Sequence, residues 1–408
     1  MNRSFFALLV SQTTTNLGFA IYTMVVVLHL YEMTGSTTLA ATVTLVSVVS
    51  RIISTIFLPA ISDKFKPSKL LMYSQMSQLI LLCVLFGLFL QVINTINVMI
   101  IFFLLGFISF FNGFFSPVKS SIVKSIVPKS HRVKANSLIS SVDQTFLFAG
   151  WTFGGVLLAF LGKQNTLFIT ICLTIISILS LSLVKANMSS KVQLQEGIIT
   201  RIAIGWKYIF KHKGLRIIII MDLMEAWVGS IWIGAVTLTY VQDALGKGET
   251  WWGYINGGYY LGTILGGFLV YRFSKMLKGR LTSFMLFGSA AFGILTFVYG
   301  FVSEPFIALF LVLLMGPSYQ MRDLAQETMF QNSADEGTLM KILSARSTLV
   351  QLIFIASIIG IGALTDLIGV RLVYILSGCL LIFSSLFGLI NLQHYKKGIS
   401  LENENVNY

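Results

Sequence analysis

The chain has 408 residues, of which 55% are hydrophobic and only 11% are charged, and its formal net charge is +13. Soluble domains carry roughly a quarter charged residues, so a chain with a mean hydropathy of +0.83 cannot build a soluble surface. This composition excludes a secreted enzyme, a nucleic-acid-binding protein and a disordered tail protein. The apolar residues come in long runs, which predicts an all-α polytopic membrane protein.

Apolar runs long enough to cross a bilayer recur along the whole chain and predict twelve transmembrane helices. The first run continues to about His29, which is too long for a cleavable signal peptide. In chain order, the predicted spans are 5–29, 39–61, 70–92, 98–116, 136–161, 166–184, 215–241, 252–271, 281–301, 306–328, 342–364 and 371–393.

The longest join between spans divides the chain into two bundles of six helices. We expect an N-terminal bundle over 1–184, a cytoplasmic linker over 185–214, a C-terminal bundle over 215–394 and a disordered cytoplasmic tail over 395–408. Within the linker, apolar side chains recur near helical spacing among basic ones. This pattern predicts an amphipathic helix on the inner leaflet, although a plain linker helix fits it nearly as well.

The basic residues test both the span count and the orientation. With both termini in the cytoplasm, 24 of the 29 Lys and Arg residues fall in cytoplasmic segments and 3 fall in outer joins. Arg322 and Lys341 are counted here with the cytoplasmic join between spans ten and eleven, and Arg51 and Arg346 lie within spans. Such a split is a strong positive-inside signal, and it explains the net charge without a nucleic-acid partner.

Several short strings resemble a known family. LPAISDKFKPSKLL at 58–71 is similar to the signature loop of the major facilitator superfamily, with Asp63 at the acidic position. AGWTFGG at 149–155 resembles the antiporter signature of span five, although Trp151 replaces its Pro, and Ile108 stands where the span-four signature has Arg. Taken along its whole length, the chain looks most like the drug:proton antiporters typified by macrolide efflux proteins. Further strings carry that likeness: TGS at 34–36, SPVKSSIVKSIVP at 116–128 and TDLIGV at 365–370.

The resemblance implies a secondary active transporter that works by alternating access between two bundles. It implies a bacterial plasma-membrane protein, expected as a monomer, that exports small lipophilic or amphipathic drugs or antibiotics. The proton gradient would supply the energy, so no cofactor or metal is expected, and the partners would be substrate, protons and membrane lipids. By the same resemblance, Asp63 and Lys64 would form a cytoplasmic gate at the N-terminal end of span eleven; the alternative is a solvated loop charge.

Ionisable side chains deep in a bilayer are costly, so each is a functional candidate. Asp222 and Glu225 are three residues apart on span seven and therefore share one helix face. Two close carboxylates in a low-dielectric site cannot both ionise easily, which predicts a reversible proton site. The alternative is a structural pair that is permanently hydrogen-bonded.

Two further ionisable residues lie deep in predicted spans. Asp143 on span five is either a second protonation or gating site, or an ion-pair partner for a basic residue of the inner gate. Arg51 on span two is a permanent positive charge, so we expect it to pair with Asp143, Asp222 or Glu225. That pair would act as a switch if a proton displaces it, and as a static staple otherwise.

Small residues form stripes on two helices. Such stripes let helices approach closely, and the resemblance places spans five and eight side by side across the two halves. We therefore expect these faces to slide as the halves rock, with close packing without motion as the plainer alternative. The stripes consist of Gly150 and Gly154 on span five and of Gly258, Gly262 and Gly266 on span eight. Pro317 is expected to kink span ten.

The substrate is only weakly indicated. A polar patch that includes Gln12 and Asn16 on span one, together with Trp227 and Trp232, suits a cavity for lipophilic and cationic molecules. Ordinary packing is the alternative for these aromatic residues. A dedicated exporter of one natural product, or a mover of a (lyso)lipid, fits the same pattern. An intramembrane enzyme has no motif to support it, and a channel is the other remaining class.

Overall fold

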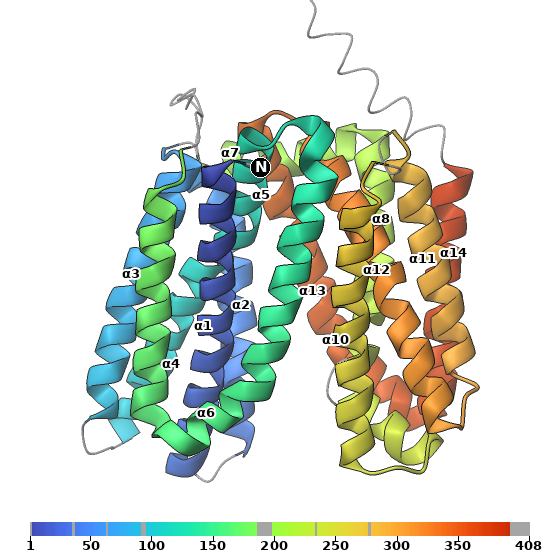
Figure 1. Cartoon of the computed structure of the whole chain (residues 1–408), viewed down its shortest axis with the longest axis horizontal. Coiled ribbons are helices and arrows are strands. Elements are labelled where there is room, and N and C mark those ends of the chain that lie inside the picture. Colours follow the sequence, from blue (N-terminus) through green and yellow to red (C-terminus); the bar gives the residue numbers. More distant parts are fainter. Residues whose placement is uncertain are drawn as a thin grey trace, which may run out of the picture. The chain divides into compact units, whose positions relative to one another are not determined.

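The computed structural model describes residues 2–34, 37–62, 64–90, 95–185, 198–232, 235–275 and 279–391. Within these ranges every regular element is a helix, as the apolar runs predict (Figure 1). Eight helices are long and apolar enough to cross a membrane, or nine if one bent pair counts as a single span. Each of the twelve predicted spans nevertheless overlaps a helix. Some of the overlapping helices are too polar or too short to be counted among the eight. One of them, α12 (Pro305–Ser333), carries Arg322, Asp323 and Glu327.

The residues group into two compact units, which are described separately. Unit 1 comprises residues 1–128, 145–205 and 335–347. Its core is an apolar cluster that includes Tyr22, Leu85, Leu105 and Leu167. Its first helices are α1 (Arg3–Thr34), α2 (Thr37–Ser62), α3 (Pro67–Phe89), α4 (Thr95–Gly113) and α5 (Phe115–Ile126).

Spans five and six lie in one long element, α6 (Arg132–Ser182), which consists of two helices that meet at Gly162. Gly162 has φ +74° and ψ 170°. Side chains with a Cβ avoid this region, so glycine is the residue that lets the chain leave one helix and enter the next here. The break falls between the predicted spans 136–161 and 166–184.

Unit 2 comprises residues 129–144, 206–334 and 348–408. Span seven was expected to be continuous over 215–241, but α8 (Lys213–Val228) ends in the 3-10 turn η2 (Gly229–Trp232). The chain then resumes as α9 (Ala235–Thr239) and the π-helical turn η3 (Tyr240–Ala244), and the two parts are bent by 57°. The other helices of this unit are α10 (Glu249–Arg272), α11 (Leu281–Tyr299), α12, α13 (Glu336–Ile368) from residue 348 onward, and α14 (Val370–Ile390).

The two units do not coincide with the two halves of the sequence. Residues 129–144, at the start of α6, belong to unit 2, and residues 335–347, at the start of α13, belong to unit 1. α7 (Ile198–Lys211) crosses from unit 1 to unit 2 after Gly205. Each half of the sequence therefore contributes a segment to the unit built mainly from the other half.

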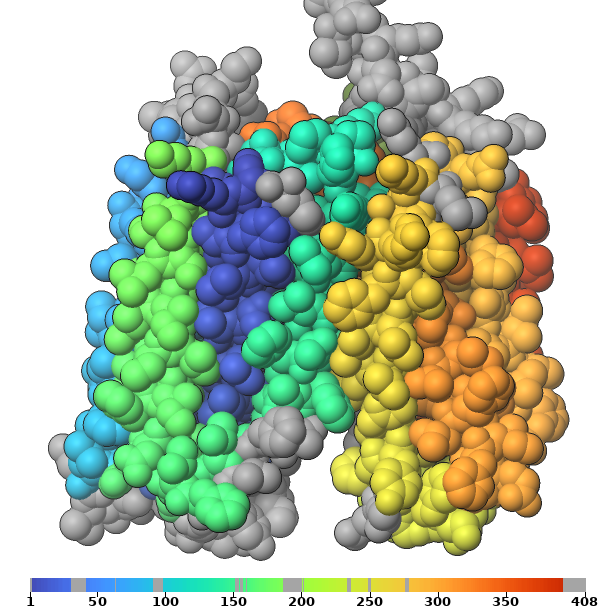
Figure 2. Space-filling model, viewed as in Figure 1, coloured from blue at the N-terminus to red at the C-terminus, as the bar shows by residue number. Residues whose placement is uncertain are grey.

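Large apolar side chains cover the outer faces of the helices, as a lipid-facing surface requires. Figure 2 shows the green part of α6 beyond Gly162 at the surface. Phe168, Ile176, Leu179 and Leu183 on this part of the helix are exposed. Their spacings of eight, three and four residues keep them on one side of the helix, so they form one stripe along it.

The glycine stripe of α10 packs tightly, but against α12 of the same unit. A Cβ on Gly258 would lie 2.7 Å from Leu309 Cδ1, and a Cβ on Gly262 would strike the carbonyl of Leu313. That carbonyl lies four residues before Pro317, which has no N–H to donate to it. Gly262 thus allows α10 to approach α12 where the proline leaves a carbonyl free of its helical partner.

The glycines of α6 also have a partner within their own unit. A Cβ on Gly150 would lie 3.1 Å from Leu17 Cδ1, and one on Gly154 would lie 2.6 Å from Met24 Sδ, both on α1. The expectation that Gly150 and Gly154 face Gly258, Gly262 and Gly266 of span eight stays a prediction. Small residues do permit close approach here, but both stripes serve packing within a unit.

Candidate functional site

The two acidic residues of α8 project on one side of the helix, as their spacing predicts. Asp222 is 4% exposed and lies among Ile218, Ile219 and Met221, which are buried apolar neighbours in the sequence. Glu225 follows one turn later, and its side chain is 13% exposed. An ionised carboxylate in such surroundings requires a partner.

That partner is Arg322 of α12. Its Nη2 atom lies 2.6 Å from Asp222 Oδ1 and 2.7 Å from Glu225 Oε2, and the Arg322 side chain is only 7% exposed. One guanidinium nitrogen therefore bridges two carboxylates on adjacent turns of α8. We call Arg322, Asp222 and Glu225 the charge cluster.

Neutral side chains complete the charge cluster. Gln326 Nε2 donates to Asp222 Oδ1 at 2.5 Å, and Ser289 Oγ of α11 donates to Glu225 Oε1 at 3.1 Å. Asp323 lies farther away, with Oδ1 at 3.9 Å from Arg322 Nη1, and its side chain is 36% exposed. Asp222 thus receives two short, strong donors, whereas Glu225 shares Arg322 and has one weaker hydroxyl donor.

One proton decides whether the charge cluster is neutral or negatively charged. A guanidinium stays protonated, so two ionised carboxylates leave the three side chains with one net negative charge. A single added proton makes them neutral. A site with an odd number of charges, shielded from water, therefore favours binding a proton or a cation.

Arg322 is the residue that the sequence interpretation missed. It was counted with the cytoplasmic join, although it lies inside the predicted span 306–328 and inside the observed α12. Its position in that span was the available signal, because a basic residue in a span needs an acidic partner. Asp222 and Glu225 were the predicted deep acids, and they are the residues that it pairs with.

Arg51 was the predicted partner of one of three deep acids, Asp143, Asp222 or Glu225. It belongs to α2 in unit 1, where its guanidinium carbon lies 5.7 Å from the centre of the Phe19 ring. The charge that pairs with Asp222 and Glu225 in the structure comes from Arg322, and pairing of Arg51 with one of the predicted acids stays a prediction. Asp143 lies in the part of α6 that belongs to unit 2 and is partly buried; its proton role stays a prediction.

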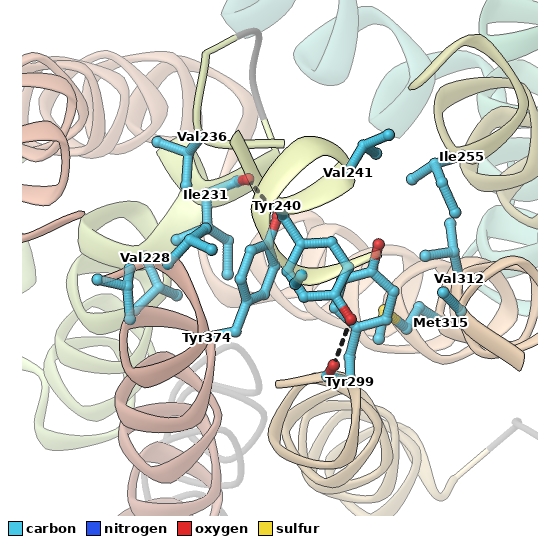
Figure 3. Close-up of a cluster of buried hydrophobic side chains, with 14 of the residues drawn as sticks. Val228, Ile231, Val236, Tyr240, Val241, Ile255, Tyr299, Val312, Met315 and Tyr374 are labelled. Atoms are coloured by element: carbon cyan, nitrogen blue, oxygen red, sulfur yellow. Dashed lines mark hydrogen bonds between the residues drawn. The ribbon is translucent and has the colours of Figure 1, made fainter. Parts of the chain in front are cut away.

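An aromatic cluster occupies the core of unit 2 beyond the acids. Trp232 lies nearly parallel to Tyr259 at 5.9 Å between ring centres and edge-on to Tyr374 at 5.3 Å. Figure 3 shows neighbouring members of this core, in which the Tyr240 hydroxyl donates to the Tyr299 carbonyl at 2.6 Å. Tyr319 of α12 lies one turn before Arg322, and the centre of its ring is 5.9 Å from the centre of the Phe292 ring. The aromatic cluster and the charge cluster are thus joined along α12.

The four predicted cavity residues have different surroundings. Trp232 is part of the aromatic cluster, and Trp227 packs where a Cβ on Gly360 would meet its ring at 2.9 Å. Gln12 and Asn16 lie on α1 in unit 1, where Gln12 is buried and Asn16 is partly buried. Their participation in a substrate cavity stays a prediction.

The predicted gate falls partly outside the described residues. Asp63 lies outside them, and Lys64 is exposed in the turn after α2. The N-terminal end of α13, where Asp63 was expected to bind, is capped by Asp335 of the same segment. Asp335 Oδ2 accepts from the backbone N–H groups of Gly337 and Thr338 at 3.2 Å each.

Within the described part of the chain, no group of three or more His, Cys, Asp or Glu side chains could hold a metal ion. The charge cluster contains two carboxylates and a guanidinium, and a bound cation would have to compete with that fixed positive charge. The structure therefore shows this site as a buried network of ion pairs.

Known proteins resemble the chain over nearly its full length. The sequence pattern of the Major Facilitator Superfamily matches residues 5–321. An uncharacterized MFS-type transporter of Bacillus subtilis (strain 168), YfmI, is 48% identical over 399 residues, covering 97% of this chain and 98% of that protein. A second protein of the same description and strain, YjbB, is 30% identical over 406 residues, with coverage of 97% and 98%.

Solved structures share the fold at low sequence identity. A bacterial homologue of the iron transporter ferroportin in an outward-facing state has a TM-score of 0.73 at 14% identity, covering 95% of this chain and 99% of that chain. The human organic anion transporter MFSD10 has a TM-score of 0.76 at 11% identity, with coverage of 95% and 99%. At these identities the likeness concerns the fold alone. Together with the sequence relatives, it shows that the chain belongs to the Major Facilitator Superfamily, whose members move substrates across a membrane.

Proposed function

We propose that this transporter is a proton-coupled antiporter that exports lipophilic or amphipathic compounds, and that the charge cluster is its proton site. The proposal rests on one observation: a single buried arginine faces two buried carboxylates at 2.6 and 2.7 Å. The odd charge makes the cluster neutral with one proton and negative without it. Alternating access gives such a site a route to each side of the membrane in turn.

Glu225 is the carboxylate that exchanges the proton. Asp222 is held by Arg322 and Gln326 and its side chain is 3% exposed, whereas Glu225 is 13% exposed and has Ser289 as its second donor at 3.1 Å. The better-solvated carboxylate with the weaker partners gains and loses a proton at a smaller cost. Asp222 then acts as the permanent counter-ion of Arg322.

The aromatic cluster supports an apolar or cationic substrate. Tyr319 connects Tyr259 and Phe292 to the turn of α12 that carries Arg322. Aromatic faces attract cations and apolar molecules alike. A cationic substrate near Glu225 would compete with the proton for the same negative charge, which is the requirement for exchange. An orientation with both termini in the cytoplasm of a bacterial cell belongs to the same proposal.

The test compares two modes of transport in proteoliposomes with ethidium as the probe. Glu225→Gln should abolish accumulation driven by a pH gradient, because the amide cannot release a proton. Ethidium counterflow, which needs no gradient, should persist at a saturating ethidium concentration, with a raised KM because the variant also removes the negative charge that attracts the cation. Asp222→Asn should impair both modes, since it removes the counter-ion of a buried guanidinium and not only a proton carrier.

Glu304→Gln provides the matched control, because Glu304 is an exposed glutamate at the N-cap of α12 with no side-chain cap hydrogen bond. It should transport like wild type in both modes. Normal gradient-driven accumulation by Glu225→Gln would refute the proton role of Glu225. Saturable transport that ignores the pH gradient in wild type would refute proton coupling altogether.

A further inference from the structure

Polar side chains on one face of α6 meet polar side chains on one face of α12 within unit 2. Asn136 Nδ2 donates to Gln331 Oε1 at 3.0 Å, and Gln331 Nε2 donates back to Asn136 Oδ1 at 3.2 Å. Asn136 Nδ2 also lies 3.1 Å from Thr328 Oγ1. Two amides that each donate to and accept from the other form a contact with defined geometry.

Further bonds extend this contact along both helices. Arg132 Nη1 donates to Asn332 Oδ1 at 2.6 Å and to the Gln331 carbonyl at 3.1 Å. Ser140 Oγ donates to Gln320 Oε1 at 2.9 Å. Residues 132, 136 and 140 are four apart and therefore share one face of α6. We call these paired side chains the α6–α12 latch.

The centre of the latch is buried and closely packed. Gln320, Thr328 and Gln331 are each at most 1% exposed, and Asn136 is 6% exposed. Val133 packs with Val270 and Leu324 in a small apolar cluster beside it. A Cβ on Gly267 of α10 would collide with Ser141 of α6, so glycine is needed for the approach of the two helices there.

We propose that the α6–α12 latch is a contact between the two halves of the sequence that must break and re-form in each transport cycle, and that Asn136 and Gln331 set its strength. α6 belongs to the first half and α12 to the second, so rocking of one half against the other separates these side chains. Amide hydrogen bonds suit this role. On opening, the amides exchange protein partners for water at a small net cost, whereas separating buried ions leaves charges without partners.

The latch is also connected to the charge cluster through α12. Gln331 Nε2 lies 3.3 Å from Glu327 Oε1, and Arg322 and Gln326 lie on the same helix between Gln320 and Thr328. A change in the ion pairs between α8 and Arg322 of α12 would therefore also shift the latch residues on α12. This link rests on the proposed function, whereas the existence of the latch does not.

The test measures opening without substrate or proton gradient. Val133, which is 8% exposed, is replaced by Cys in a background where Cys83, Cys172 and Cys379 are Ser, and labelling by a water-soluble maleimide is timed. Gln331→Leu and Asn136→Leu should each label about tenfold faster than the parent, which corresponds to about 1.4 kcal/mol. The double exchange Asn136→Gln with Gln331→Asn should restore slow labelling, because it keeps both amides.

Gln75→Leu is the matched control. Gln75 is also a buried glutamine, and its amide donates to Thr15 Oγ1 at 3.0 Å within the first half of the chain. It should label at the parental rate. Ser140→Ala, which loses only the bond to Gln320, should label two- to threefold faster (about 0.5 kcal/mol), and it serves if the leucine variants fail to fold.

Equal labelling rates of the cysteine at position 133 in the Gln331→Leu, Ser140→Ala and Gln75→Leu variants would overturn the proposal that the latch limits opening. Fast labelling with no change in gradient-driven transport would confirm that the contact opens but refute its role in the cycle. Because labelling needs no proton, failure of the antiporter proposal would leave the labelling result unchanged, so the two failures can be distinguished.

Discussion

Arg322 Nη2 and Asp222 Oδ1 lie 2.6 Å apart, and the two side chains are 7% and 3% exposed. Such a buried pair contributes little net stability compared with apolar packing, but removal of one partner leaves a charge stranded. The contact between α8 and α12 is therefore more sensitive to loss of the arginine than to loss of the whole cluster.

Replacement of Arg322 alone should strongly destabilise the protein. Arg322→Gln leaves two buried carboxylates without a counter-ion, and we expect a loss of about 3–5 kcal/mol, measured as thermal unfolding in detergent. The triple variant Arg322→Gln, Asp222→Asn, Glu225→Gln should recover most of that stability. A triple variant as unstable as the single one would contradict the electrostatic explanation.

Close packing of α10 on α12 predicts opposite effects for two neighbouring glycines. Gly262→Ala places a methyl group against the Leu313 carbonyl, which should cost about 1–3 kcal/mol. Gly257→Ala has no neighbouring atom within 4 Å of its new Cβ and should stabilise the helix slightly. The unfolding temperatures of both variants are compared with that of wild type. An unchanged unfolding temperature for Gly262→Ala would disprove the contact.

The Tyr240 hydroxyl should stabilise the core of unit 2. It donates to the Tyr299 carbonyl at 2.6 Å and lies 3.1 Å from the Val302 carbonyl (Figure 3). Tyr240→Phe leaves both carbonyls without this donor and should cost about 1 kcal/mol. Tyr254→Phe is the control, because Tyr254 is 54% exposed. Equal unfolding temperatures for the two variants would contradict the prediction.

Asp335 should make stability depend on pH at the acidic end. Partial burial acts to raise its pKa, but hydrogen bonds from Thr338 and the charge of Lys124 outweigh burial, so the pKa lies below the usual 3.8. The unfolded chain then binds the proton more readily than the folded one. The stabilisation is therefore present above the ordinary pKa and is lost as pH falls through the folded value.

The corresponding measurement compares thermal unfolding at about pH 6 and about pH 3. Asp335→Asn keeps an acceptor for the cap but no titrating group, so it should lose less stability on acidification than wild type. Asp335→Ala removes the cap of α13 and should cost about 1 kcal/mol at about pH 6, and less at about pH 3, where the wild-type carboxylate has begun to take up its proton. An identical acid response of Asp335→Asn and wild type would exclude Asp335 as the titrating group.

The helices were predictable from the sequence because their signal is local and repeated. The apolar runs located a helix at each predicted span, and the spacing of Asp222 and Glu225 placed both on one face. The break of span seven after Val228 and the Gly162 break inside α6 depend on neighbouring packing and on one backbone conformation, so composition locates them only roughly.

The partners of charges and glycines were not predictable in the same way. A spacing of three or four residues shows which side of a helix a residue occupies, but not which helix lies there. For this reason the sequence did not predict that Arg322 pairs with Asp222 or that Gly262 packs on α12. The exchanged segments 129–144 and 335–347 are likewise a property of long-range contacts, which no local pattern encodes.

The exchange of segments has a consequence for biosynthesis. The first half leaves the ribosome with residues 129–144 already made, but their packing partners on α12 are not translated until the chain passes Pro305. Asn136 and its neighbours therefore lack these partners while spans six to ten are inserted. Folding of the first half is completed only by the arrival of the second.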